Sequence, residues 1–169
     1  MIYLLWPQNT KQMLLDLNDS KNFRAFFKHF KTFVNKKNLL ISETFFRIIT
    51  KNLKVKFIRS LKIRYVFSNN AKFSTQNAIT ITNLDAFINQ LSKFVEEDLY
   101  IFGDLMTISN FFNKVDYVVT LIYDNLKAKT IKKIDCCDFG NYTLLTTREV
   151  TKNWTCNIYT ASKTTNKGL

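Results

Sequence analysis

The sequence predicts a single α/β domain, in which a mainly parallel central sheet carries helices on both faces and ends in an antiparallel pair of strands. Three observations predict it. Short apolar runs alternate with amphipathic stretches along most of the chain, which is the order that builds a parallel sheet. Apolar residues make up 46% of the chain, enough for a hydrophobic core. Two alternating runs near the end are separated by one short loop, which is typical of an antiparallel ribbon.

The first half of the chain opens with a strand and a helix. Residues 2–6 are an apolar run that Pro7 should close, because proline cannot donate to a sheet ladder. Apolar residues recur at helical spacing over 23–34 and predict an amphipathic helix, with His29 on its polar face and expected to face solvent. The next segments are predicted as a strand at 38–41, a helix at 43–50 and strands at 65–67 and 78–81.

The second half repeats this alternation before it changes. Asn83 is placed to cap a helix, and Asp104 is placed to cap another directly after the turn at Gly103. Strands are predicted at 99–102 and 117–122, and the C-terminal ribbon at 142–150 and 154–159. The domain is expected to span 1–162, followed by a disordered tail at 163–169.

Composition excludes several classes of protein. No stretch approaches about 20 uncharged apolar residues, and the N-terminus lacks the features of a signal peptide, so we expect a cytoplasmic protein without a membrane span. Zinc needs about four converging ligands and the chain holds one histidine, so no metal site is predicted. Three cysteines, two of them adjacent, imply no disulfide framework.

The charge balance allows a nucleic-acid partner without favouring it. Twenty Lys and five Arg against thirteen acids give a formal net charge of +12. Lys, Asn, Ile and Phe are abundant whereas Gly, Pro and Ala are few, and translation from an AT-rich genome explains this composition better than a selected basic surface. Lys and aromatic residues do not interleave in a recognisable RNA-binding motif.

Particular residues carry a resemblance to one family. The opening stretch Met-Ile-Tyr-Leu-Leu-Trp-Pro-Gln, the Phe30-Lys31 pair on the first helix and the run Ile101-Phe102-Gly103-Asp104 occur in an order and at a spacing that resemble dihydrofolate reductase over about residues 1–162. The resemblance implies an oxidoreductase of one-carbon metabolism. With NADPH as its cofactor, such an enzyme reduces 7,8-dihydrofolate to tetrahydrofolate by hydride transfer, here as a monomer with folate as its small-molecule partner.

The resemblance also implies two binding sites. Substrate would lie against side chains of the first strand, the first two helices and one lysine: Leu5, Trp6, Phe26, Phe30, Ile48 and Lys62. The cofactor would contact residues at the ends of three strands: Thr44, Ser68, Phe102, Gly103 and Asp104. Thr120 aligns with the strand threonine that supports the catalytic carboxylate.

The departures from the family concern the reactive groups. The position of the acid that anchors the pterin is Phe26, so the catalytic residue is unknown, and Asp16 and Asp19 are the nearby acids that could replace it. Asp104 stands for a glycine and brings a carboxylate to the place where helix N–H groups would face a pyrophosphate. The sequence thus leaves three functions open: a reductase, a catalytically inactive binding protein of the same fold and, least favoured, a protein that binds nucleic acid through its basic surface.

Overall fold

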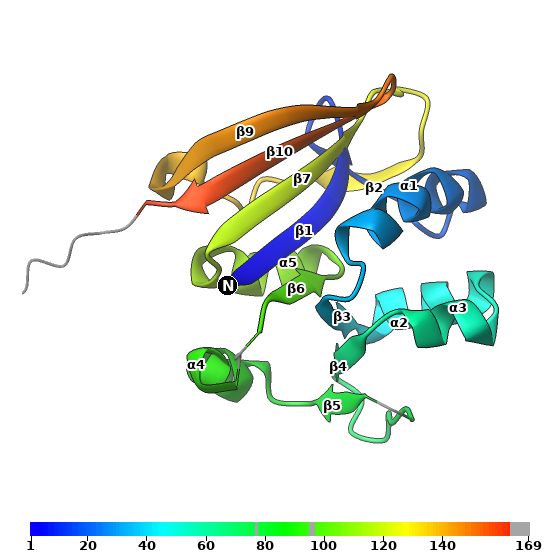
Figure 1. Ribbon diagram of the computed structural model, residues 1–169, viewed down its shortest axis with the longest axis vertical. Helices are drawn as coiled ribbons and strands as arrows, with labels where there is room; N and C mark the ends of the chain where they lie inside the picture. Colours follow the sequence, from blue (N-terminus) through cyan, green and yellow to red (C-terminus); the bar gives the residue numbers. More distant parts are fainter. Residues whose placement is uncertain (77, 95–96, 163–169) are drawn as a thin grey trace, which may run out of the picture.

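The strands of the molecule form one mixed sheet around a parallel centre. The computed structural model describes residues 1–76, 78–94 and 97–162. Within this part of the chain the strand order is β5-β4-β3-β6-β1-β7-β10-β9, and neighbours from β5 to β7 run parallel (Figure 1). The parallel strands are β1 (Ile2–Asn9), β3 (Asn38–Ser42), β4 (Ile63–Phe67), β5 (Ile79–Ile81), β6 (Leu99–Phe102) and β7 (Tyr117–Tyr123).

Antiparallel strands complete the sheet at one edge. β10 (Trp154–Ala161) pairs antiparallel with β7 on one side and with β9 (Tyr142–Thr151) on the other. The short strand β2 (Met13–Leu15) pairs with β1 at Gln8 and with β8 (Thr130–Lys133). The prediction of a mainly parallel sheet with an antiparallel C-terminal pair is confirmed.

Helices cover both faces of the sheet. α1 (Ser20–Phe33), α2 (Glu43–Asn52) and α3 (Val55–Ser60) lie on one face, whereas α4 (Leu84–Phe94) and α5 (Leu105–Phe111) lie on the other (Figure 1). Two short 3₁₀ helices, η1 (Phe112–Lys114) and η2 (Phe139–Asn141), follow α5 and precede β9. No described helix is both long enough and apolar enough to cross a bilayer.

Each face of the sheet has its own core, because successive side chains of a strand point to opposite sides. On β1, Leu5 joins the core under α1 and α2, whereas Leu4 and Trp6 join the core under α4 and α5. On β7, Leu121 and Val118 are divided between the same two cores. The alternation fixes which residues can reach the space between α1 and the sheet.

Two expectations about single residues were wrong. β1 continues through Pro7 to Asn9, and this is tolerated because β6 has already ended at Phe102, opposite Leu5. His29 is only 8% exposed and packs against Trp154 with ring centroids 5.3 Å apart. Burial, and secondly the neighbouring Lys28, lower the pKa of His29.

The short helix α3 and the short strands β2 and β8 were not predicted. α3 buries no residue completely, and β2 and β8 span only three and four residues. Such segments carry little periodicity, so their pattern resembles that of loops. The predicted tail at 163–169 lies outside the described residues.

Candidate functional site

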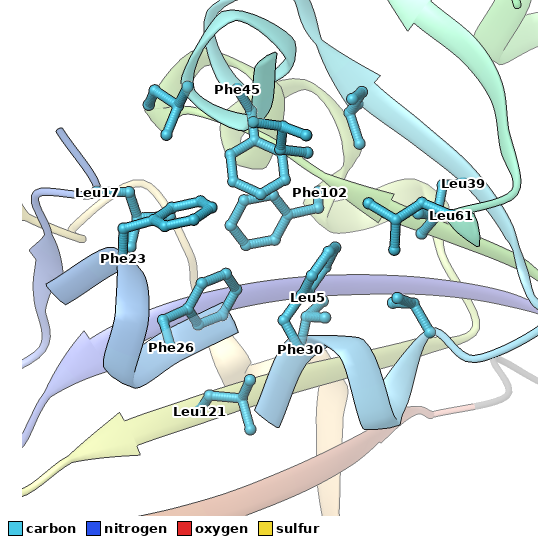
Figure 2. Close-up of a cluster of buried hydrophobic side chains, with 14 of the residues drawn as sticks. Leu5, Leu17, Phe23, Phe26, Phe30, Leu39, Phe45, Leu61, Phe102 and Leu121 are labelled. Atoms are coloured by element: carbon cyan, nitrogen blue, oxygen red, sulfur yellow. The ribbon is translucent and has the colours of Figure 1, made fainter. Parts of the chain in front are cut away.

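Four aromatic side chains fill the space between β1, α1, α2 and β6. They are Phe26 and Phe30 of α1, Phe45 of α2 and Phe102 of β6, called here the Phe cluster (Figure 2). The ring centroids of Phe45 and Phe102 are 4.1 Å apart, and Phe26 lies 5.2 Å from both Phe30 and Phe102. All four side chains are at most 2% exposed. The four rings form a continuous apolar cluster that fills this space.

Local structure aims these rings at one point. Phe26 and Phe30 are four residues apart, which places them one turn apart on the same side of α1. The hydroxyl of Ser42 caps α2 by accepting the backbone N–H of Phe45 at 3.1 Å, which sets the first turn from which Phe45 projects. Leu5 and Leu121 close the cluster from the sheet (Figure 2).

A small cavity remains beside the Phe cluster at the carboxyl ends of β1 and β6. Its volume is about 60 Å³. Pockets for small molecules usually span about 300–1,000 Å³, and a water molecule takes up about 30 Å³. The cavity therefore has room for water and none for a two-ring heterocycle. Its lining includes six of the residues named from the sequence: Asp16, Thr44, Ile48, Phe102, Gly103 and Asp104.

The two candidate acids hold local structure. Asp19 is the N-cap of α1, where its Oδ1 accepts the backbone N–H groups of Lys21 and Asn22 at 3.1 Å each. The bond from the Asn22 N–H is the main cause that lowers the pKa of Asp19. Asp16 accepts the N–H of Asn18 at 2.9 Å, as an aspartate in a turn does. Of the two, only Asp16 lines the cavity.

Thr120 does not face the α1 side of the sheet. Val119 and Leu121 belong to the core under α1 and α2, so the alternation of β7 turns Thr120 to the opposite face. Leu121 is the residue that faces the Phe cluster (Figure 2). The Oγ1 of Thr120 is buried and has no hydrogen-bond partner within the described residues. Thr120 therefore lies on the other side of the sheet from Phe26, although Leu121, the next residue of the strand, faces the Phe cluster.

Two of the predicted substrate contacts also lie elsewhere. Trp6 belongs to the core under α4 and α5, where its indole Nε1–H donates to Gln8 Oε1 at 2.9 Å. Lys62 precedes β4, at the end of the strands opposite the cavity, and its Nζ pairs with Glu97 Oε2 at 3.3 Å. Leu5, Phe26, Phe30 and Ile48 do come together.

The predicted cofactor residues divide between the cavity and a turn. Ser68 is buried and its Oγ accepts the backbone N–H of Asn70 at 2.9 Å, which closes the turn after β4. Thr44 is exposed in the first turn of α2 and lines the cavity. Glu43, beside it, forms an ion pair with Arg47 at 3.0 Å.

The residues at the start of α5 do not fit a dinucleotide. Asp104 caps the helix, with its Oδ1 accepting the N–H and the Oγ1–H of Thr107 at 3.0 Å each. The carboxylate occupies one of the backbone N–H groups that a pyrophosphate would use, that of Thr107, and repels the charge of a pyrophosphate. A Cβ on Gly103 would lie 2.6 Å from Thr107 Oγ1, so the helix itself requires this glycine. No step through a nicotinamide follows from this arrangement.

Sequence reasoning missed two members of the site, Phe45 and Leu121. Phe45 follows the Ser42 N-cap by three residues, a signal that fixes its place in the first helical turn. The side chains of β7 alternate between the two faces of the sheet, so the face of Leu121 follows once the face of one other residue in this strand is known.

Comparison with known proteins identifies the architecture. No family model matches the sequence, and no curated protein matches it significantly. Among solved structures, the chain is similar to a dihydrofolate reductase from Enterococcus faecalis complexed with NADP(H) and RAB-propyl. The TM-score is 0.70 at 9% sequence identity, and the alignment covers 95% of this chain and 96% of that one. The chain therefore has the dihydrofolate reductase fold.

Proposed function

We propose that this chain is a catalytically inactive binding protein of the dihydrofolate reductase fold. One observation carries the proposal. At the position where the family resemblance puts the pterin, Phe102 contacts both Phe26 and Phe45, and beside these rings a cavity of only about 60 Å³ remains.

Energetics oppose a folate at this place. Burial of a phenylalanine side chain contributes about 1.5–3 kcal/mol, so a ligand would have to replace the contacts of every ring that it displaces. A pterin amino group facing Phe26 would lack its acceptor, and an unpaired buried donor costs about 1–3 kcal/mol. The binding energy of a folate would have to exceed both costs before the ligand could react.

The cofactor side adds electrostatic repulsion. Asp104 begins α5 and Glu43 begins α2, the two helix ends that flank the cavity. Helix N-termini bind phosphates through free N–H groups and a positive dipole. Carboxylates at both ends weaken that attraction, which disfavours NADPH.

A second candidate is the reductase itself, with NADPH reducing 7,8-dihydrofolate to tetrahydrofolate. The observation that favours it is Asp16, an acid that lines the same cavity as Phe102 and Gly103. To serve as the missing acid, Asp16 would have to release the N–H of Asn18, and the Phe cluster would have to open.

Spectrophotometry with NADPH and dihydrofolate distinguishes the two. The inactive protein is expected to show no loss of NADPH absorbance above background at high protein concentration. The variant D16N tests the second candidate, and D19N is its matched control because asparagine caps a helix as well as aspartate does. Turnover by the natural sequence that D16N abolishes and D19N preserves would overturn the proposal.

A further inference from the structure

The positive charge of this molecule is concentrated in one segment. Residues 20–64 contain thirteen Lys and Arg and a single acid, Glu43, which gives this segment a formal charge of +12. The rest of the chain contains twelve bases and twelve acids and is neutral. A genome-wide compositional bias acts on the whole chain and does not confine the acids to one part of it. The segregation therefore calls for a local explanation.

The fold gathers this segment on one side of the molecule. Residues 20–64 comprise α1, α2 and α3, which lie side by side, together with β3 inside the sheet (Figure 1). Some of the cations are neutralised, because Arg47 pairs with Glu43, Lys37 with Asp98 and Lys62 with Glu97. The other ten lack an ion pair within the described residues, and among them are Arg24, Lys28, Lys31 and Lys56.

Arg24, Lys28 and Lys31 line a groove between α1 and the α2–α3 connection. Lys56 lies beside it, next to the ring of Phe57. Two adjoining hollows of about 600 and 350 Å³ share Phe27, Lys28 and Leu53. Phe27 and Leu53 are half-buried, so the groove has an apolar floor. We call it the α1–α3 groove.

An exposed aromatic ring lines this groove, and two cations lie close to it. Phe57 of α3 is 39% exposed, and the Nζ atoms of Lys31 and Lys56 lie 5.7 and 5.0 Å from its ring centroid. A second pair, Arg47 over Phe73 at 5.7 Å, extends the pattern beyond α2. The folded chain thus interleaves cations with aromatic rings, although the linear sequence does not.

We propose that the α1–α3 groove binds single-stranded nucleic acid. Proteins that bind single strands combine a cationic groove along the backbone with aromatic rings on which bases stack. The ammonium and guanidinium groups would contact phosphates, and the ring of Phe57 would stack on a base. A bilayer surface fits less well, because the apolar floor at Phe27 and Leu53 is recessed between helices. The proposal stands whether or not the central cavity is catalytic, since the groove lies outside the Phe cluster.

Fluorescence anisotropy of a labelled oligouridine, about twelve nucleotides long, tests the proposal on the full-length chain at several salt concentrations. The variant K28Q/K31Q/K56Q removes three cations in or beside the groove. Each lost phosphate contact lowers the salt slope by about 0.7, so affinity in about 0.1 M salt should fall on the order of a hundredfold. The matched control K114Q/K132Q/K152Q removes the same charge at exposed positions outside the segment and should change affinity only a few-fold.

Two further measurements sharpen the test. F57L should weaken binding about tenfold and leave the salt slope unchanged, because stacking is lost while the phosphate contacts remain. A duplex of the same length should bind more weakly than the single strand. Equal losses in the two triple variants, equal affinity for the duplex, or binding to phosphatidylserine vesicles without binding to the oligonucleotide would each overturn the proposal. Circular dichroism of each variant verifies its fold.

Discussion

At the scale of single residues, the contact between Phe26 and Phe102 decides whether the central space is closed. The two rings lie 5.2 Å apart at an interplanar angle of 22°, in an otherwise apolar surrounding. Stacked aromatic pairs contribute about 0.5–1.5 kcal/mol beyond the area that they bury. We predict that F26L and F102L each destabilise the protein, and that the double variant loses less than the sum of the two by that amount.

Urea unfolding of the four proteins measures this coupling. Additivity within about 0.3 kcal/mol, as distant sites show, would mean that the rings do not act together and that the space can open. A matched pair such as F26L with I108V, which lies in the other core, should be additive.

His29 provides a pH-dependent test of burial. Burial lowers its pKa in the folded protein, so the folded state binds fewer protons than the unfolded state between the folded pKa and the unfolded value of about 6.5. The stability that depends on a neutral His29 should therefore be complete above about pH 6.5. It should be lost as the pH falls through the pKa of His29 in the folded protein. In H29Q this part of the pH dependence should vanish, as urea midpoints at pH 5 and 7.5 would reveal. An identical pH profile for both proteins would contradict it.

Residue patterns predicted burial well and register poorly. Helical spacing on 23–34 identified Phe26 and Phe30 as inward-facing, and both are fully buried. The same spacing suggested that His29 faces solvent, but the helix packs closely enough against Trp154 to cover it. For Thr120, resemblance to a family motif could not distinguish neighbouring positions, because a shift of one residue reverses the face of a strand.

At the scale of elements, α5 depends on its cap. Asp104 accepts two hydrogen bonds from Thr107, and loss of such a cap typically costs about 1 kcal/mol. In a chain of this size D104A should lower the melting temperature by about 2–4 °C. D104N keeps the acceptor and should retain most of that stability. If D104N is as damaging as D104A, the charge rather than the hydrogen bonds stabilises the helix end.

Elements with strong periodicity or clear boundaries were predictable, and the others were not. The strand Leu99–Phe102 has the predicted bounds, since charge precedes it and Gly103 follows. In α3, Val55 is 62% exposed and Phe57 belongs to neither hydrophobic core, so its apolar residues do not mark a buried face. β2 pairs with β8 across more than a hundred residues, a long-range pairing that local pattern does not encode.

At the scale of the whole molecule, the order of the strands places distant segments together. β1 is central because β6 and β7 both pair with it. The first strand therefore cannot complete its hydrogen bonds until residues near 100 and 120 are in place. Alternation of strands and helices and the family resemblance predicted the class of sheet, whereas the order of its strands was not predicted. Neither indicated that the site would be closed, because closure depends on how four rings pack in three dimensions.

Charge segregation makes a prediction about the stability of the whole protein. Cations gathered on α1, α2 and α3 repel one another, and salt screens this repulsion as the Debye length falls from about 30 Å at 0.01 M to about 8 Å at 0.15 M. Sodium chloride should therefore raise the melting temperature of the natural sequence. K28Q/K31Q/K56Q should melt higher in low salt and gain less from added salt, whereas K114Q/K132Q/K152Q should respond to salt as the natural sequence does. Equal salt responses of all three proteins would show that the repulsion is spread over the entire surface. Residues 20–64 would then have no excess charge repulsion that a bound polyanion could reduce.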